Sequence, residues 1–379
     1  MKKTLIALTL AALPVASMAE VTLFGTIKGG LEVTKVKGVK NTVTNLNDWD
    51  SSIGFKGEED LGNGLKAIWQ LQSKAGINAA NARNDRRNDL TSFIGLDAGT
   101  FGKIRAGNLP DAIKDMGDLN LDDSGHGVRD LGNWEDTGAR YTAARYDSAN
   151  FGGFSFNVLY SPEDNQRYEK LGSPSVHGFE QAYGGGENIP AVLNGATHNG
   201  NRWVASLGLN YEIAGFFVKY GYTHQNDRHD FYNSNVHRLM GGYDANNIFV
   251  GMGYQYTKGF FGPKMATSEI ALSAAYRIGN VVPRLSYVHG FKQKSFGEKV
   301  PHSKYDQVVL GADYHLSKRT TVIASLGWAK EGALAYAGWD AAGNPTSGGL
   351  VGFVKDKETG DWKTKEQAYS FGLGLRHKF

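Results

Sequence analysis

Residues 65–74 read LKAIWQLQSK, and apolar and polar side chains alternate along them with a period of two. One face of such a strand is apolar and carries Leu65, Ala67, Trp69 and Leu71. The same alternation recurs at 21–33, 154–160, 203–211 and 216–222. Many segments sustain it for about 9 to 11 residues, the length that a tilted membrane strand requires. The pattern therefore predicts strands with one apolar and one polar face.

Turn signals separate about sixteen such segments along the chain. Short turns are expected at 60–64, 98–102, 245–247, 278–280 and 316–318. The intervening links are longer and more polar, and the longest lie near 108–138, 162–201 and 331–366. Short turns at one rim and long loops at the other are typical of outer-membrane barrels. We therefore predict an all-β protein, a 16-stranded antiparallel transmembrane β-barrel, in one domain at 20–379.

The N-terminal residues 1–19 have the pattern of a secretory signal peptide. Lys2 and Lys3 precede the apolar run 5–13, and the small-x-small triplet Ser17-Met18-Ala19 follows. Cleavage is expected before Glu20. The apolar run is too short for a membrane-spanning helix, which needs about 20 residues. The sequence thus predicts export without helical insertion.

The composition is near neutral and contains no cysteine. The signal supplies two lysines and no acid, so the net charge of +3 falls to +1 after cleavage, which argues against nucleic acid as a partner. A fold without cysteine must be stable without disulfides. The chain has 50 glycines and 12% aromatic residues. Glycine permits strand curvature and aromatic residues mark membrane interfaces, so both suit a barrel.

Catalytic and metal sites have little support in the sequence. The ten histidines are scattered, and neither an HExxH motif nor a phosphate-binding loop occurs. His224 and His229 lie near Asp227 and Asp230, which we interpret as a solvated surface. We predict no enzyme, metal or cofactor. A serine-hydrolase barrel remains an alternative because a triad is recognised by geometry. A soluble β-sandwich or exported adhesin is the other, since alternation alone shows only that one face is dry.

Several long motifs resemble the trimeric neisserial-type porins of the Gram-negative outer membrane, over nearly the whole mature chain. They are EVTLFGTIKGGLEV at 20–33, IGFKGEEDLGNGLKAIWQ at 53–70, SFIGL at 92–96, FGKIRAG at 101–107, RYDSANF at 145–151, VHRLMGGYD at 236–244, AYRIGNVVPRLSYVHGF at 275–291, YDQVVLGADYHLSKRT at 305–320 and GLRHKF at 374–379. The resemblance implies a homotrimer among outer-membrane lipid and lipopolysaccharide. It also implies passive diffusion of ions and small hydrophilic solutes through a water-filled channel. The terminal Phe379 resembles the signal that the outer-membrane assembly machinery reads.

The link 107–139 is long and acidic, and in porins resembling this chain the third outer loop folds into the barrel. Its eight acids and two bases leave a net charge of −6. The acids that we expect near a constriction are Asp111, Asp115, Asp118, Asp122 and Asp123. A loop of this length is usually functional or disordered. One departure is Asn108, where the family often has arginine.

Basic residues flank this loop, and we expect them on the barrel wall at Lys66, Lys74, Lys103, Arg105, Arg140 and Arg145. Lysine or arginine on the lipid side costs roughly 2–4 kcal/mol at the midplane, so the lumen is favoured. Arg140 and Arg145 differ in parity, so at least one lies in a loop, at a bulge or near an interface. A basic wall opposite an acidic loop would set a transverse field that selects ions. In the alternative, the charges only solvate the loop and hold it by ion pairs.

Overall fold

The computed structural model describes residues 20–37, 42–77, 90–117, 119, 121, 124, 137–162, 203–228, 232–260, 264–299, 303–330, 338–339, 345–346, 353–355, 362–364 and 367–379. The predicted signal peptide, 1–19, lies outside the described residues. In the described part of the chain, no helix is long and apolar enough to cross a membrane.

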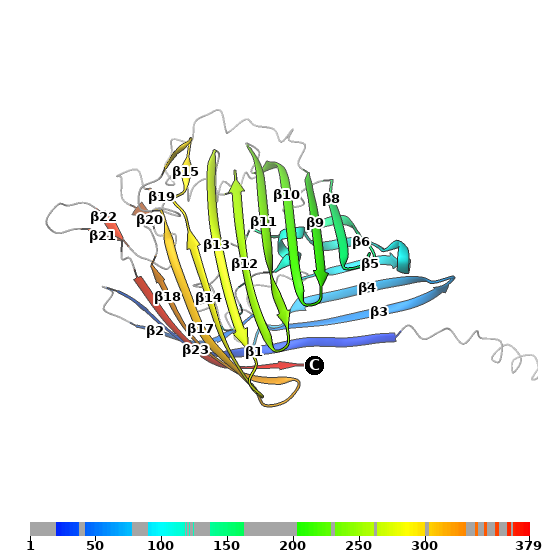
Figure 1. The fold of residues 1–379 in the computed structure, drawn as a ribbon, viewed down its shortest axis with the longest axis horizontal. Helices are drawn as coiled ribbons and strands as arrows, with labels where there is room; N and C mark the ends of the chain where they lie inside the picture. The colour runs from blue at the N-terminus through cyan, green and yellow to red at the C-terminus, as the bar shows by residue number, and fades with distance from the viewer. Residues whose placement is uncertain are drawn as a thin grey trace, which may run out of the picture.

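Sixteen long strands of the described residues form a closed antiparallel β-barrel, as predicted (Figure 1). In barrel order they are β1 (Glu20–Val36), β3 (Ser52–Gly62), β4 (Leu65–Lys74), β5 (Ser92–Asp97), β6 (Lys103–Pro110), β7 (Arg140–Asp147), β8 (Phe154–Ser161), β9 (Val204–Ile213), β10 (Phe216–Arg228), β11 (Tyr232–Ala245), β12 (Ile248–Lys258), β13 (Met265–Tyr276), β14 (Val281–Gly290), β17 (Tyr305–His315), β18 (Thr320–Lys330) and β23 (Gln367–Lys378). Each strand pairs with its neighbour in sequence, and β23 returns to β1.

Short elements extend the barrel or lie in its connections. They are β2 (Val43–Asp48), η1 (Gly99–Phe101), α3 (Ala112–Met116), β15 (Lys294–Ser295), β16 (Glu298–Lys299), β19 (Gly338–Trp339), β20 (Pro345–Thr346), β21 (Phe353–Lys355) and β22 (Trp362–Thr364). β2 and β3 both pair with β1, along successive parts of its length. They therefore act as one barrel strand that is interrupted at 49–51.

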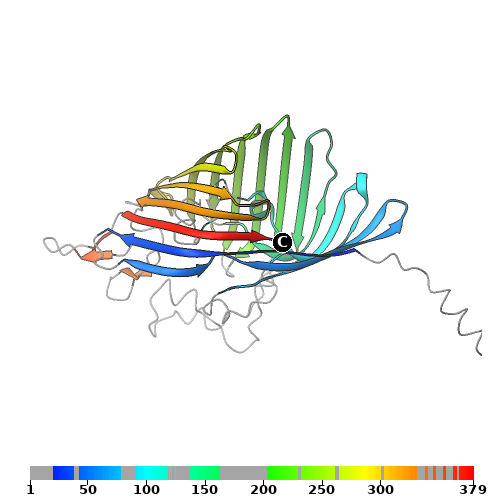
Figure 2. The ribbon, with the colours of Figure 1, turned by 90° about the horizontal axis from the view of Figure 1, so that it is seen from below.

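The two ends of the chain close the barrel. β1 and β23 pair antiparallel from Thr26 and Lys378 to Val36 and Ala368, and they lie side by side in Figure 2. Beyond β23, the backbones of Phe379 and Gly25 exchange two hydrogen bonds of 3.0 and 3.1 Å. In the part of the chain that the structure describes, this closure leaves the barrel itself without a free edge, as a membrane-spanning sheet requires in lipid.

The short turns fall where the sequence predicts them, and local conformation explains why. Between β11 and β12, Asn246 and Asn247 have φ angles of 54° and 65°. Two consecutive left-handed residues make the type of two-residue turn that matches the twist of a hairpin, and asparagine tolerates this conformation better than most residues. The turn fixes the register of both strands, Tyr243 opposite Val250.

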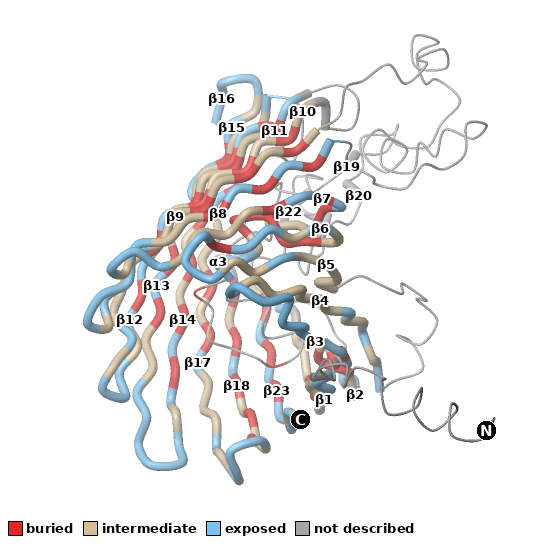
Figure 3. Tube along the Cα trace, turned by 90° about the vertical axis from the view of Figure 1, so that its right-hand side faces the viewer, coloured by how far each residue is buried: buried red, intermediate tan, exposed pale blue. Residues whose placement is uncertain are grey.

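The barrel is polar inside and apolar outside. Exposed side chains on the outer face include Leu71, Ile94 and Ile104, of which Ile94 is 69% exposed. Buried polar side chains occupy the opposite parity of the strands, as in Ser206, Thr223, Gln255 and Ser286. Figure 3 shows this alternation of buried and exposed positions along the strands. A soluble sandwich would bury its apolar face, so the observed arrangement excludes it.

Candidate functional site

The link between β6 and β7 begins with a short helix that the sequence caps at both ends. Asp111 is the N-cap of α3, and its carboxylate accepts a hydrogen bond of 2.7 Å from the Lys114 amide. Gly117, with a φ of 74°, ends the helix. Aspartate is a strong N-cap and glycine is the preferred left-handed residue after a helix.

Side chains from the interior face of the barrel bind the backbone of this segment. The Ser206 hydroxyl on β9 accepts a hydrogen bond of 2.8 Å from the Ala112 amide. Further along, the Leu121 amide donates to the Ser286 hydroxyl on β14 at 3.2 Å, and the Ser273 hydroxyl on β13 donates to the Leu119 carbonyl. The described residues of this part of the link, 111–117, 119 and 121, which we call the crossing segment, therefore contact the inner wall at β9, β13 and β14.

Arg238 on β11 donates hydrogen bonds to the backbone of α3 from the inner wall of the barrel. Its guanidinium donates to the carbonyl oxygens of Ile113 and Gly117 at 3.2 and 2.7 Å. It also donates twice to Oε1 of Gln255, at 2.8 and 2.6 Å, and Thr137 donates to the same oxygen at 3.1 Å. This buried network holds both the start of the link, at Ile113 and Gly117, and its end, at Thr137, against β11 and β12.

An apolar cluster inside the barrel adds to these contacts. Leu119 packs with Met240, Ala271 and Val288, which are buried on β11, β13 and β14. At Gly221 a Cβ atom would lie 2.5 Å from the sulfur of Met116. A larger residue at that position would force the Met116 side chain to move, so glycine permits the helix to approach the wall closely.

Arg145 and Arg105 join the base of the crossing segment to the wall. Arg145 is 3% exposed and donates to the Pro110 carbonyl at 2.9 Å. It also forms ion pairs with Asp115 at 2.6 Å and with Asp147 at 2.7 Å. Arg105 pairs with the other oxygen of Asp147 at 2.6 Å. Of the predicted site residues, the structure thus brings Arg105, Arg145 and Asp115 into one chain of alternating charges.

Asp111, the first residue of the crossing segment, is completely buried. Its second carboxylate oxygen accepts a hydrogen bond of 3.0 Å from Thr223 on β10. Burial raises the pKa of Asp111 to about 6, although the hydrogen bonds from Lys114 and Thr223 act in the opposite direction.

The other predicted basic residues lie apart from this cluster. Lys66 pairs with Glu58 at 2.7 Å and Lys103 pairs with Asp97 at 2.9 Å, both near short turns. Lys74 lies 3.6 Å from Asp50. Because Lys66 and Lys74 stand at opposite ends of β4, about 27 Å separates them along the strand.

Arg140 is the first residue of β7 and donates to the Thr91 hydroxyl at 3.0 Å. Arg140 thus lies at the loop end of β7, and its side chain points to the opposite face of the strand from that of Arg145. Asp118, Asp122 and Asp123 lie outside the described residues. Phe379 lies at the barrel seam, where its backbone bonds to Gly25.

The wall opposite the crossing segment carries lysines. In the closed strand order, β3 and β4 lie across the barrel from β9–β14. Lys66 on β4 and Lys56 on β3 belong to this wall, and the Lys56 ammonium lies 5.7 Å from the ring of Phe24. Lys56 was not among the predicted site residues, although the same alternation that places Phe55 outside places Lys56 inside.

Arg238 and Arg284 are further charged residues inside the barrel, and neither was among the predicted site residues. Arg284 pairs with Asp313 and donates to Ser325 at 2.9 Å. Neither arginine belongs to a cluster of charged residues in its own strand. Only the alternation of inward and outward positions could have indicated that their side chains lie inside the barrel. In the part of the chain that the structure describes, no group of His, Asp or Glu side chains is placed to hold a metal.

The chain is similar to known outer-membrane proteins in sequence. A family model described as Gram-negative porin matches residues 26–343. The major outer membrane protein P.IB of Neisseria meningitidis serogroup A is 41% identical, with all of both chains covered. The P.IB protein of Neisseria sicca is also 41% identical, over 88% of this chain and 95% of its own length.

Solved structures share the fold at lower identity. An anion-selective porin from Comamonas acidovorans matches with a TM-score of 0.68 and 20% identity, over 95% of this chain and all of that one. The trimer form of OmpT, an outer membrane protein of Vibrio cholerae, matches with a TM-score of 0.57 and 13% identity, over 95% of this chain and 99% of that one.

Proposed function

The chain belongs to the Gram-negative porin family, and on that premise we propose that its outer-membrane channel is narrowed by charge, between the crossing segment and a lysine wall. The porin itself is a channel protein of the outer membrane and not an enzyme. Its ion selectivity would be set by acids of the third loop on one side of the channel and by Lys56 and Lys66 on the other side.

The observation that carries the proposal is the attachment of the crossing segment to five interior side chains. Ser206, Thr223, Arg238, Ser273 and Ser286 come from five different strands, and each bonds to the segment. A segment held at so many points stays on the wall while solutes pass. The link carries a net charge of −6, so its remaining acids would face lysines across the lumen.

Arg105 and Arg145 have a different role in this proposal. Their charges are offset by Asp147 and Asp115 at distances of 2.6–2.7 Å. We therefore assign them to anchoring the loop, with a smaller effect on passing ions. Lys56 is exposed and its ammonium has a ring contact, which leaves its charge available to solutes. The basic residues thus divide into two groups: Arg105 and Arg145, which are little exposed and anchor the loop, and the more exposed Lys56 and Lys66, which set the field in the channel.

Conductance in a planar lipid bilayer tests the proposal. Purified folded protein should give stepwise openings, and replacing Lys56 and Lys66 by Gln should shift the reversal potential in a salt gradient toward cations. The control is Lys318→Gln in the short turn between β17 and β18, which should leave the potential unchanged. A silent bilayer would contradict the channel, and an unchanged potential in the double variant would contradict the lysine wall.

We also propose a homotrimer, by resemblance and because one matched solved structure is a trimer form. Conductance steps in groups of three would support it, and steps that occur only singly would contradict it. Its apolar exterior would contact neighbouring copies, outer-membrane lipid and lipopolysaccharide.

Two proposals concern the ends of the chain. Sequencing of the mature protein should give Glu20 as its first residue, if 1–19 is a cleaved signal. Deleting Phe379 should slow insertion by the outer-membrane assembly machinery, because the terminal aromatic residue is the expected recognition signal. Unchanged insertion rates would leave Phe379 with its seam contacts to Gly25 alone.

A further inference from the structure

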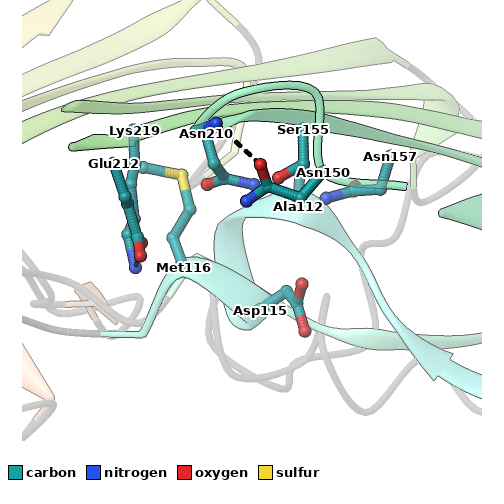
Figure 4. Close-up of a pocket in the computed structure, with 10 residues that line it drawn as sticks. Ala112, Asp115, Met116, Asn150, Ser155, Asn157, Asn210, Glu212 and Lys219 are labelled. Atoms are coloured by element: carbon teal, nitrogen blue, oxygen red, sulfur yellow. Dashed lines mark hydrogen bonds and ion pairs between the residues drawn. The ribbon is translucent and has the colours of Figure 1, made fainter. Parts of the chain in front are cut away.

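The charged side chains beside α3 are paired with one another. Asp115, Glu212 and Lys219 line a small cavity between the helix and the strands behind it (Figure 4). Asp115 pairs with Arg145 at 2.6 Å, and Glu212 pairs with Lys219 at 3.1 Å. The charges at this cavity are therefore offset within the protein.

Exposed lysines without such partners gather where β12–β18 meet their longer links. They include Lys258, Lys264, Lys294, Lys299, Lys304 and Lys330. In the part of the chain that the structure describes, none of these six forms an ion pair. Asp306 lies among them, but it already pairs with His289 at 2.7 Å. Long links mark the extracellular rim of an outer-membrane barrel, so this basic patch lies at the level of the outer leaflet.

Three of these lysines form a row on the outer face of the sheet. Ala266 on β13 lies opposite both Lys258 on β12 and Lys294 on β15, and Lys294 lies opposite Lys299 on β16. Residues directly opposite in antiparallel strands share a face. Lys258 has the parity of Met252, which is 64% exposed on the outer face. Neighbouring strands lie about 4.8 Å apart, so the outer lysine row (Lys258, Lys294 and Lys299) spans roughly 14 Å.

The hairpin that carries two of these lysines has two unfavourable features. Lys294 and Lys299 are like charges placed directly opposite each other, which destabilises a strand pair. The turn between them consists of Phe296 and Gly297, with φ angles of 52° and 93°. A bulky residue rarely adopts a positive φ, and the Phe296 side chain is also 69% exposed. A partner that is both anionic and apolar would offset both features.

We propose that the outer lysine row binds the phosphate groups of lipids in the outer leaflet, with Phe296 packed beside the lipid at the level of the headgroups. Each ammonium supplies three donors and no acceptor, which suits phosphate oxygens. The row shares its face with Met252 and Leu272, which are 64% and 44% exposed, so a bound lipid can cover both the charged and the apolar positions. Lysines attract anionic headgroups, and aromatic residues favour the membrane interface.

The inference rests on the proposed lipid contact of the barrel exterior and does not depend on the charged constriction. It assigns the sector at β12–β16 to lipid at its extracellular end. Contacts between neighbouring copies would then lie on another sector of the barrel.

Native mass spectrometry of the purified, folded, full-length mature protein tests the proposal, with lipid A as the probe. The wild type should bind lipid A more tightly than the same glycolipid without its phosphates. The triple variant Lys258→Gln, Lys294→Gln and Lys299→Gln should bind lipid A more weakly by about tenfold or more, because each lysine near an anionic lipid surface adds to the attraction.

Phe296→Gly separates a lipid contact from a purely structural role. Glycine relieves the positive φ, so this variant should unfold at a temperature no lower than the wild type. It should nevertheless bind lipid A several-fold more weakly, because the exposed ring is lost. Unchanged lipid A binding in this variant would contradict the contact at Phe296.

A matched control removes three exposed cations from the opposite rim, Lys318→Gln, Arg319→Gln and Lys378→Gln, and should leave lipid A binding unchanged. Equal binding of the dephosphorylated glycolipid, or full binding by the variant of the outer lysine row, would overturn the proposal. Heparin binding without lipid A binding would assign the row to a soluble polyanion, and an altered subunit number would assign it to a contact between copies. Bilayer conductance of the same variant should match the wild type, so failure of the lipid site and failure of the channel are distinguishable.

Discussion

Arg145 on β7 and Asp115 on α3 form an ion pair of 2.6 Å that joins the barrel wall to the crossing segment. The two ends of this pair are in different environments, because the Arg145 side chain is 3% exposed and that of Asp115 is 43% exposed. Removal of Arg145 should therefore loosen the crossing segment to a different extent than removal of Asp115.

Arg145→Met should release the base of the crossing segment. It removes the donor that Arg145 supplies to Asp115 and to the Pro110 carbonyl and leaves Asp147 with Arg105 alone, and breaking a buried pair from one side costs about 3–5 kcal/mol. Asp115→Asn removes a solvent-exposed partner and should cost no more than about 1 kcal/mol. Hydrogen exchange of the amides at 112–117 measures both. Equal protection in the two variants would contradict the anchoring role of Arg145.

Arg238→Met should loosen α3 and make the open channel noisier and more conductive. The variant loses the bonds to the Ile113 and Gly117 carbonyls, which close both ends of the helix against β11. The matched control is Arg284→Met, which also removes an interior arginine but one bonded to Asp313 and Ser325. Single-channel recording compares them. Indistinguishable noise in the two variants would show that Arg238 does not hold the loop.

Acidification from pH 7 to pH 5 should strengthen the docking of the crossing segment. Burial raises the pKa of Asp111 to about 6, so the docked form prefers the neutral carboxyl. The cost of the charged form is fully present above pH 6 and disappears as pH falls toward the ordinary pKa of 3.8. The full effect is on the order of 3 kcal/mol.

Amide exchange at 112–117, corrected for its intrinsic pH dependence, measures this change. Asp111→Asn is the control, since asparagine also caps helices and does not titrate. Its protection should be constant over the same pH range. A wild-type segment with the same protection at pH 5 and pH 7 would contradict the assignment to Asp111.

Lys103→Gln with Arg105→Gln should shift ion selectivity less than Lys56→Gln with Lys66→Gln. Lys103 and Lys66 are alike, because each has an accessible side chain with a carboxylate within 3 Å, Asp97 and Glu58. The two double variants differ in their second residue: Arg105 is only 17% exposed and is paired with Asp147 at 2.6 Å. Lys56 is exposed and its ammonium lies 5.7 Å from the ring of Phe24, so its charge remains available to passing ions. Reversal potentials in a salt gradient rank the two double variants. The reverse order would place the constriction at β6 instead.

The barrel could be predicted from the sequence because period-two alternation is a local property. Leu71 outside and Lys66 inside follow from their positions in one strand, and closure then follows from strand number and turn spacing. The partners of Arg145 could not be predicted, because Asp115 reaches it only after the link has crossed the barrel. Arg238 was missed for the same reason: its role depends on a helix more than one hundred residues earlier in the chain.

The most direct test of the account uses the absence of cysteine from the chain, which allows single cysteines to be introduced at Gln70 and Leu71. A charged, water-soluble thiol reagent should reduce the conductance of the variant at position 70 and leave the variant at position 71 unaffected, while a probe confined to the bilayer interior should react only at position 71. Reaction with the opposite preference would mean that the polar face does not line a water-filled channel.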